Sequence, residues 1–419
     1  MNNFQTIILG IFGFFIIAGL LAVSMARQSS KDGLVSISVW GSAPRSVMDE
    51  IIRASFDEDK LRVSYTEVSE NAFDQNLLEA LAAGRGPDMV LLPLELLLRY
   101  KDKLQTIPFT NYTERTFKDN FIQEGDLFLS SNGIYALPFM LDPLVMYFNR
   151  DFLDEAGMSQ APKYWDEFIT LGKNLTLRDD KGAISRSAVA LGEYRNVNYA
   201  REILAALLLQ SGTPVVSATP TGPRVALTGG KASSVLNFYT EFANPLKPVY
   251  SWNGSLPNSK SAFLASRLGV YFGLGSEWNE LRKANPNLNF DVALFPKPRD
   301  LSVGTTYGKL TGSAILRTSS KASASLQVAY AFASPQVGKM LHAQTGLPPV
   351  QRILLTAKPT DSYGAIMYDS AGRSRGFLDP NPKISADVFR TMIESVTNGK
   401  MQSSEALNKA EGELQRALR

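Results

Sequence analysis

The sequence predicts an α/β fold built on a doubly wound, mainly parallel sheet. The first observation is a regular order of strand and helix patterns over residues 35–92. The second is a pair of segments, rich in proline or glycine, that resemble crossings between two lobes. The length of 419 residues corresponds to two or three domains at about 150 residues per domain.

The first five elements follow from hydrophobic periodicity. Apolar and polar side chains alternate at 35–40 and 62–68, and residues 89–92 are all apolar, so that all three segments are predicted to be strands. Between them, apolar side chains recur at helical spacing over 47–56 and 73–83. Because parallel sheets bind ligands at the carboxyl ends of their strands, the residues that follow each strand are candidates for a site.

Two segments interrupt this pattern. Residues 134–149 are apolar but contain Pro138 and Pro143, and because proline is confined to sheet edges we expect a crossing there rather than a long central strand. Residues 295–312 contain several prolines and glycines and are interpreted as a second irregular crossing. The remaining prediction is helices at 165–175 and 199–210, a loop at 217–224, a helix at 230–242, strands at 268–272 and 290–294, and helices at 325–333, from Pro335 onward, at 386–396 and at 404–418.

The first thirty residues are interpreted as an N-terminal membrane segment or a signal. No charged side chain occurs from Phe4 to Ala26, a length that as a helix matches the roughly 30 Å hydrocarbon core of a bilayer. An uncleaved anchor and a cleaved signal both stay open, and the length of the apolar run favours the anchor. Arg27 and Lys31 follow the span, so the positive-inside rule gives no support for an outward-facing body.

Composition excludes several functional classes. The 43 Lys and Arg residues nearly balance 40 Asp and Glu residues, with no long basic run, which argues against a nucleic-acid binder. The chain has no cysteine, so disulfides, thiol nucleophiles and cysteine metal sites are excluded, as is a lipid anchor on cysteine. With a single histidine, His342, it also lacks the residues for a poly-histidine metal site.

Catalytic motifs are missing. Residues 304–311 (GTTYGKLT) differ from a phosphate-binding P-loop in glycine spacing and in the residue after the lysine. The chain has no G-x-S-x-G or S-x-x-K motif, and His342 is interpreted as a helix-surface residue. We therefore expect no catalytic residue, no metal and no cofactor, although a pair of glycosidase carboxylates could still converge from distant parts of the chain.

Three tryptophans lie outside strong helical patterns. Trp40, Trp252 and Trp278 fall at strand ends or in loops. Aromatic rings at the rim of a sheet form stacking surfaces for flat apolar faces such as that of a pyranose. Burial between domains is the competing interpretation of each ring.

Four segments, in order, resemble family 1 extracellular solute-binding proteins of ATP-binding-cassette importers, the maltose-binding-protein-like group. Residues 77–91 (LLEALAAGRGPDMVL) resemble the family's helix, glycine turn and Pro-Asp before a strand. Residues 133–167 contain GIYALPF, MYFNRDFLDEAGM and APKYWDEF. Residues 262–298 contain AFLASRLGVYFG and DVALFPKP, and residues 312–350 contain GSAIL, SPQVGK and TGLPPV. Tyr164 stands where the family usually has a helix-capping Thr, and Ser266-Arg267 replaces its glycine.

The resemblance implies a two-lobed, periplasmic-binding-protein-like fold of type II, with hinge crossovers. Lobe 1 would comprise residues 31–141 and 300–345, and lobe 2 residues 142–299 and 346–419, after the N-terminal segment 1–30. A small solute, most simply a sugar, would bind in the cleft between the lobes and favour closure. The partners implied are this solute, the transmembrane subunits of an importer and, through the N-terminal helix, the membrane, with the body outside the cytoplasm as a monomer.

Six residues are expected to contact the solute. Trp40 and Ser42 end the first strand, Asp142 lies at the first crossing, and Tyr307 lies at the second. Trp252 and Trp278 come from second-lobe loops. A membrane-anchored glycan hydrolase outside the cytoplasm is the competing function, and a ligand-sensing protein of the same fold is a third.

Overall fold

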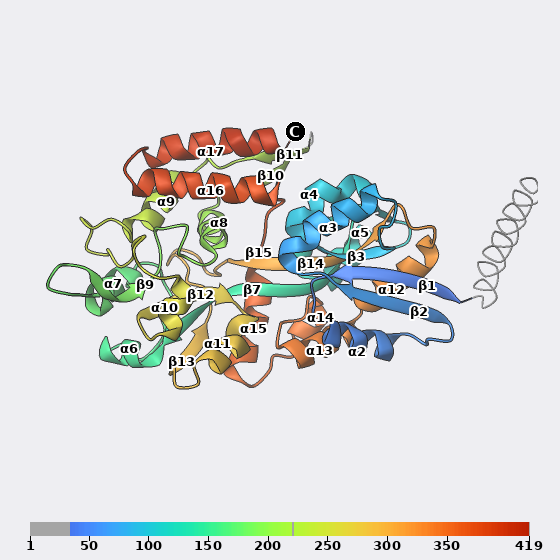
Figure 1. Ribbon diagram of the computed structural model, residues 1–419, viewed down its shortest axis with the longest axis horizontal. Coiled ribbons are helices and arrows are strands. Elements are labelled where there is room, and N and C mark those ends of the chain that lie inside the picture. The colour runs from blue at the N-terminus through green and yellow to red at the C-terminus, as the bar shows by residue number, and fades with distance from the viewer. Residues whose placement is uncertain (1–33, 220–221, 419) are drawn as a thin grey trace, which may run out of the picture.

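The computed structural model describes residues 34–219 and 222–418, which form two lobes side by side (Figure 1). In the described residues one mixed sheet runs through both lobes in the order β2-β1-β3-β14-β7-β12-β9-β8. Its two longest strands, β7 (Leu137–Asn149) and β14 (Thr306–Leu316), pass from one lobe to the other. The predicted α/β fold with two lobes is confirmed.

Lobe 1 begins with the predicted strand and helix alternation. β1 (Val35–Gly41) pairs in parallel with both β2 (Leu61–Glu67) and β3 (Met89–Pro93). α3 and α4 lie on one side of this sheet and α2 and α13 on the other (Figure 1). The other bounds in lobe 1 are α2 Arg45–Ser55, α3 Glu70–Ala82, α4 Leu97–Tyr100, β4 Leu104–Gln105, β5 Ile107–Pro108, α5 Glu114–Asn120, the 3-10 helix η3 Gln123–Phe128, β6 Gly133–Ile134, α12 Ala322–Phe332, α13 Pro335–Thr345 and α14 Arg352–Leu355.

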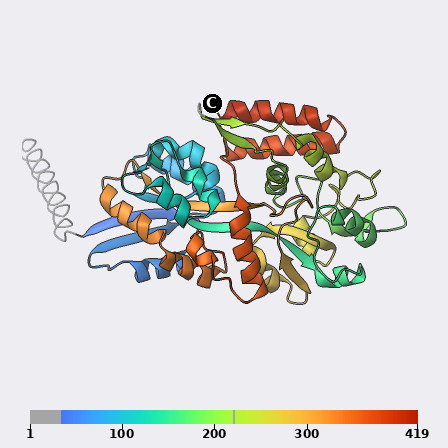
Figure 2. The same cartoon turned by 180° about the vertical axis from the view of Figure 1, so that it is seen from behind.

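Lobe 2 repeats the same design with more helix. β12 (Leu268–Leu274) pairs in parallel with β9 (Ile184–Val189) and antiparallel with β7. The C-terminal helices α16 (Pro382–Thr397) and α17 (Ser403–Ala417) pack together along one side of this lobe (Figures 1 and 2). The other bounds are α6 Arg150–Glu155, α7 Glu167–Leu175, β8 Leu177–Arg178, α8 Ala200–Gln210, β10 Val216–Thr219, β11 Gly222–Val225, α9 Ala232–Glu241, α10 Ser259–Leu264, α11 Glu277–Ala284, β13 Phe290–Ala293, α15 Ser362–Arg373 and β15 Ser374–Arg375.

The expectation that prolines exclude a long strand at 134–149 was wrong. β7 contains both Pro138 and Pro143, yet it is a strand of 13 residues. At residues 137–143 β7 pairs only with β14, and its ladder with β12 begins at Leu144. Each proline therefore lies where β7 has an unpaired side, on which a missing N–H costs no ladder hydrogen bond.

Two other segments are more regular than predicted. Residues 306–312, placed in an irregular crossing, form the first half of β14. Residues 217–224, interpreted as a loop, lie largely in the antiparallel pair β10 and β11. In both segments glycine or proline lies within or at the end of a strand, and the backbone pairing of the neighbouring strand decides the structure.

Two hydrophobic cores show where the chain passes between lobes. Leu141 and Leu310 belong to the core of lobe 1, whereas Leu144 and Tyr307 belong to the core of lobe 2. Farther along the chain, Ala371 packs in the core of lobe 1 and Phe377 in the core of lobe 2, and we call the segment between them the third crossing. The hinge strands therefore change cores within a few residues of one another. The boundaries proposed at 141/142, 299/300 and 345/346 stay a prediction, and Val350, beyond the last of them, packs in the core of lobe 1.

The predicted helix ends agree with the local geometry. Gly84, after α3, has a φ of 66°, a left-handed conformation that glycine adopts without strain. The Ser334 hydroxyl accepts the N–H of Val337 and caps α13 ahead of Pro335. At Tyr164, where the usual threonine cap is missing, the Glu167 carboxylate accepts the N–H of Tyr164 at 2.9 Å.

The N-terminal segment 1–30 lies outside the described residues. Within 34–219 and 222–418, every helix is too short or too polar to cross a membrane.

Asp88 joins three segments of lobe 1. Its carboxylate accepts the Ser38 N–H and hydroxyl, both at 2.9 Å, and the Ser319 hydroxyl at 2.7 Å, and it pairs with Lys321 at 3.1 Å. Burial opposes ionisation, but these hydrogen bonds outweigh it and lower the pKa of Asp88. Asp88 is thus structural in this fold, although it lies in a segment that resembles a family signature.

We expect Asp88→Ala to lower the free energy of unfolding by about 2–3 kcal/mol at pH 7, because four donors lose their acceptor. Because the folded pKa is depressed, this stabilisation is present above the unfolded value and is lost as the pH falls through the folded pKa. The mutant and the wild type should therefore converge toward pH 3 in urea titrations. Asp49→Ala, a control on α2 whose side chain is 46% exposed, should stay within about 1 kcal/mol of the wild type. Equal losses in both variants would contradict the structural role of Asp88.

Candidate functional site

The carboxyl ends of the parallel strands in both lobes point toward the hinge. Trp40 and Ser42, at the end of β1, are half-buried there. Glu95 follows β3, and Ser276 follows β12 in the other lobe. We call this region, bounded by these strand ends and by the hinge strands, the interlobe face. It is the place where the rule for open α/β sheets puts a ligand.

Asp142 lies in the floor of the interlobe face, on β7. The residue is 8% exposed, and its Oδ1 accepts the N–H of Ser276 at 3.0 Å, which ties the hinge strand to lobe 2. Its partner across the ladder is Lys309, which pairs with Glu70 at the start of α3 in lobe 1. Burial raises the pKa of Asp142 to about 6, although the Ser276 hydrogen bonds and Lys309 oppose the change. The two residues thus place a carboxyl group and an ammonium group side by side on the hinge.

An aromatic group stands beside Asp142. The ring of Trp278, in the first turn of α11, lies nearly parallel to that of Tyr363, with centroids 5.1 Å apart and an interplanar angle of 22°. Tyr147 continues this parallel arrangement behind Trp278. The Tyr363 hydroxyl donates to the Gly275 carbonyl at 3.0 Å, which joins α15 to the strand end that also holds Asp142. We call Tyr147, Trp278 and Tyr363 the aromatic group.

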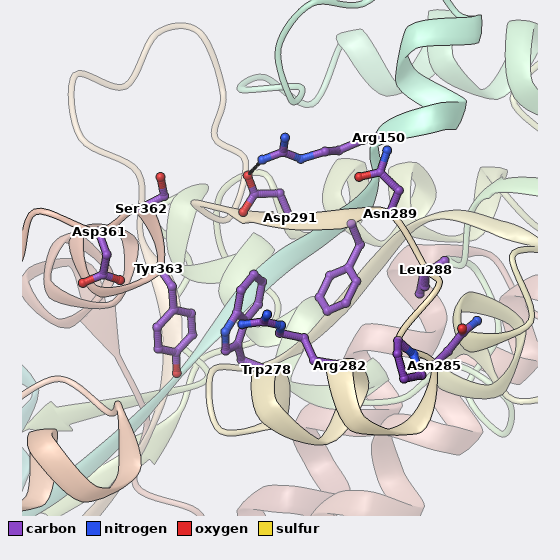
Figure 3. A pocket seen from close by; sticks show the side chains of 12 residues that line it. Arg150, Trp278, Arg282, Asn285, Leu288, Asn289, Asp291, Asp361, Ser362 and Tyr363 are labelled. Carbon is purple, nitrogen blue, oxygen red and sulfur yellow. Dashed lines mark hydrogen bonds and ion pairs between the residues drawn. The ribbon is translucent and has the colours of Figure 1, made fainter.

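Trp278 and Tyr363 line one side of a hollow of about 610 Å³ in lobe 2 (Figure 3), whereas Tyr147 is buried behind them. The Arg282 guanidinium lies over the Trp278 ring, 5.6 Å from its centroid. Arg150 and Asp291 form an ion pair at the opposite side. Amide, guanidinium and carboxylate groups thus surround the rings of Trp278, Phe290 and Tyr363. This combination suits a ligand with apolar faces and many hydroxyls.

The first turn of α11 is fixed by a buried carboxylate. Glu277 accepts the Tyr271 hydroxyl at 2.8 Å and pairs with Lys260 at 2.8 Å. It also accepts the Tyr199 hydroxyl at 3.3 Å. Tyr199 has a left-handed backbone with a φ of 57°, a strain of order 1–3 kcal/mol that tends to occur at functional sites. These contacts hold Trp278, the next residue, in place.

A charged cluster joins the lobes directly. Arg201, near the start of α8, pairs with Glu95 of lobe 1 at 3.1 Å and with Asp379, in the third crossing, at 3.1 Å. It also pairs with its neighbour Glu202 at 2.7 Å. Burial raises the pKa of Asp379 to about 6, with Arg201 opposing the change. One guanidinium therefore serves three carboxylates at the contact between lobes.

Two of the six expected residues lie in the core of lobe 2. Trp252 is 1% exposed, and its Nε1 donates to the Asn196 side chain at 3.0 Å, so it presents no ring face to a ligand in this conformation. Tyr307 is 6% exposed and packs edge-on against Phe377. The structure brings Asp142 and Trp278 together and leaves Trp40 and Ser42 on the facing lobe.

Sequence reasoning missed Tyr363, Tyr199, Glu95, Arg201 and Asp379. Arg201 and Tyr363 lie in ordinary helical patterns, and nothing local marks them. Two other arginines have partners outside the interlobe face: Arg195 pairs with Glu394, and Arg375 donates to Gln123 behind the hinge. Across the described part of the chain, no cluster of three or more His, Asp or Glu side chains could hold a metal ion.

Comparison with known proteins identifies the family. Residues 41–333 match the family described as bacterial extracellular solute-binding protein. The chain therefore belongs to this family. The resemblance recognised in the sequence is thereby confirmed.

Individual relatives are distant. A binding protein of Brucella abortus is 26% identical over 159 residues, which are 36% of this chain and 38% of the Brucella protein. An arabinooligosaccharide-binding protein of Halalkalibacterium halodurans is 29% identical over 26% of each chain. The matches thus span well under half the length of these curated relatives. The solved maltose/maltodextrin-binding domain of Bdellovibrio bacteriovorus, bound to maltotriose, is 15% identical with a TM-score of 0.67, covering 92% of this chain and all of that one, and shows the shared fold.

Arg201 is expected to be a major source of stability between the lobes. Arg201→Met leaves three carboxylates without a counter-ion, so the free energy of unfolding at pH 7 should fall by about 3–5 kcal/mol. The loss should shrink toward pH 5, because a protonated Asp379 no longer needs a counter-charge.

Urea unfolding of Arg201→Met beside Arg195→Met tests this expectation. Arg195 pairs with Glu394 but is 74% exposed, and its loss should change stability by about 0–1 kcal/mol. Similar losses in the two variants, or an Arg201→Met loss that is independent of pH, would contradict the interpretation.

Proposed function

We propose that this chain is the solute-binding subunit of an ABC importer, located outside the cytoplasm, and that it binds a carbohydrate between its two lobes. Membership of the extracellular solute-binding family supports the class. The observation that carries the ligand class is the pairing of Trp278 with Tyr363, directly after a strand end and beside the Asp142 carboxyl group. Aromatic faces bind the apolar faces of a pyranose, and carboxylates and amides accept or donate to its hydroxyls.

Solute binding would draw the lobes together. Trp40, Ser42 and Glu95 belong to lobe 1, and Trp278 and Asp142 belong to lobe 2 or to the hinge strand. A solute that contacts both sets favours a narrower interlobe face by the difference in its affinity for the two conformations. A micromolar dissociation constant, about −8 kcal/mol, is sufficient for a hinge equilibrium of a few kcal/mol.

Relatives narrow the choice of probes. Because the names of two of them refer to arabino-oligosaccharides and to maltotriose, those sugars are the first to test. Transfer to permease subunits, a monomeric state and attachment through the segment 1–30 belong to the same proposal. The chain acts without covalent chemistry in this proposal, which separates it from a glycan hydrolase.

A thermal-shift screen with maltotriose, an arabino-oligosaccharide, glucose, a dipeptide and phosphate tests the ligand class. A sugar at 100 times its dissociation constant should add about 2.7 kcal/mol of stability. The sugar should be recovered intact after prolonged incubation. Stabilisation by the dipeptide or phosphate alone would overturn the carbohydrate assignment, and release of smaller sugars would favour the hydrolase.

Trp278 and Trp252 form a matched pair for a second test. Trp278→Ala should weaken binding of the stabilising sugar at least tenfold, about 1.4 kcal/mol, with a smaller effect on folding. Trp252→Ala should lower the free energy of unfolding by about 3–5 kcal/mol, as for a core aromatic, and leave the dissociation constant of the folded protein unchanged. Titration calorimetry and urea unfolding measure both quantities. Unchanged affinity in Trp278→Ala would exclude the aromatic group from the site.

A further inference from the structure

One carboxylate behind the hinge has no partner. Glu124, in η3 of lobe 1, is 1% exposed, and within the described residues neither of its side-chain oxygens has a hydrogen-bond partner. An unpaired buried carboxylate is costly to keep ionised, and most proteins avoid one. Its position therefore calls for an explanation.

Two glycines of the crossing strands make room for this carboxylate. A Cβ on Gly308 of β14 would collide with Oε2 of Glu124, and a Cβ on Gly376 would lie 2.7 Å from Oε1. Gly308 lies between Tyr307, in the core of lobe 2, and Leu310, in the core of lobe 1. Gly376 follows β15, which pairs with the start of β14. The carboxyl group thus fits between two of the three segments that cross from lobe to lobe.

The charged groups around Glu124 are bound elsewhere. Arg375 of β15 is the charged group that acts on Glu124, but its guanidinium donates to Gln123 and to the Ser374 carbonyl. Nearby charged groups are Asp126 of η3 itself, Lys118 of α5, which pairs with Glu114, and Arg352 of α14, which donates to the Phe121 carbonyl. The packed strands also carry Lys309 and Asp142, which lie beside each other on the ladder. Burial raises the pKa of Glu124 well above its ordinary value, with only Arg375 opposing.

Glu124 lies on the opposite side of the hinge strand from the interlobe face. Successive side chains of a strand point to opposite faces. Gly308 faces Glu124, whereas the next residue, Lys309, reaches Glu70 and lies beside Asp142. A rotation that narrows the interlobe face on one side of β14 must loosen the packing on the other side. The segments that enclose Glu124 would then move apart.

We propose that Glu124 is a positioning residue of the hinge: its protonated carboxyl group holds the lobes in the conformation described here, and narrowing of the interlobe face exposes the group and releases its proton. The hinge role itself does not depend on the proposed function. Only one consequence rests on that function, namely that the affinity for the solute falls as the medium becomes more acidic. The two segments that enclose the group, and its lack of any hydrogen-bond partner, carry the argument.

The sign follows from proton linkage. The described conformation binds one proton more than the narrowed one at pH values between the two pKa values of Glu124. The population of the narrowed conformation then rises with pH, by at most about tenfold per pH unit. Because glutamine imitates the protonated form, Glu124→Gln should keep the described conformation at every pH.

The absence of cysteine makes a direct measurement possible. In the full chain, Arg53→Cys on α2 and Asn279→Cys on α11 place one dye on each lobe, at exposed positions. Energy transfer between the dyes is recorded from pH 5 to pH 8.5 without any solute, so the result does not depend on the carbohydrate assignment. The same pair of dyes is introduced into Glu124→Gln and into Asp126→Asn, a control for a neighbouring carboxylate on the same 3-10 helix.

In the proposed mechanism the dye distance in the otherwise unchanged chain shortens as the pH rises. Glu124→Gln removes this dependence, and Asp126→Asn keeps it. A distance independent of pH, or a dependence that persists in Glu124→Gln, overturns the proposal. Should Glu124→Gln fail to fold, Gly376→Ala provides the second variant: its methyl group competes with the carboxyl group for space, so a shorter dye distance at every pH supports the proposal and an unchanged profile overturns it.

Discussion

The antiparallel ladder between β7 and β14 is the constraint on which the molecule depends. It runs from Gly308 opposite Pro143 to Ser313 opposite Leu137, and the same two strands also pair with β3 in lobe 1 and β12 in lobe 2. Each lobe is thus built outward from a strand that it shares with the other lobe. Where the strands pass from one core to the other, Gly308, which has no side chain, lies opposite Pro143, which has no N–H. Bending at this point breaks few ladder hydrogen bonds, whereas bending elsewhere would break a sheet.

Buried carboxyl groups gather along this ladder. Asp142 lies on the side of the interlobe face, Glu124 lies behind the ladder, and Asp379 lies beside the third crossing. Burial raises the pKa of all three. Such groups weaken a fold compared with apolar residues. In the proposed hinge mechanism, Glu124 lies where solvent access changes when the lobes move, so its cost differs between conformations. That difference in cost is the quantity that couples charge to hinge motion.

Most of lobe 1 could be predicted from the sequence because its signals are local. The alternation at residues 35–40 and the helical spacing at 47–56 reflect one buried face each, and both elements formed as expected. The hinge could not be predicted in the same way. Pro138 and Pro143 argue locally against a strand, but the pairing that tolerates them is formed with residues more than 160 positions later. Local pattern carries no information about which side of a strand stays unpaired.

The residues of the candidate site show the same contrast between local sequence signals and long-range contacts. The position of Trp278 near the hinge could be predicted because it follows a strand end closely, and the carboxyl end of a strand faces the hinge in this fold. Trp252 carries the same local signal of an aromatic in a loop, yet the Asn196 side chain satisfies its indole N–H within the core. Arg201 shows the converse case, a helical residue whose partners Glu95 and Asp379 come from two other parts of the chain.

Function in this molecule therefore depends on contacts of long sequence separation that converge on the hinge. The Arg201 pair with Glu95 illustrates the energetic consequence. This pair joins the lobes in the described conformation, so a ligand would gain only the contacts that narrowing adds to it. An exposed ion pair would contribute little to stability, but the Arg201 side chain is only 12% exposed. Because an unpaired buried charge is costly, Arg201 and Glu95 must stay paired during any rotation of the lobes. Any rotation of the lobes about the ladder is therefore limited by this pair, because separating the two charges would leave each of them without its partner.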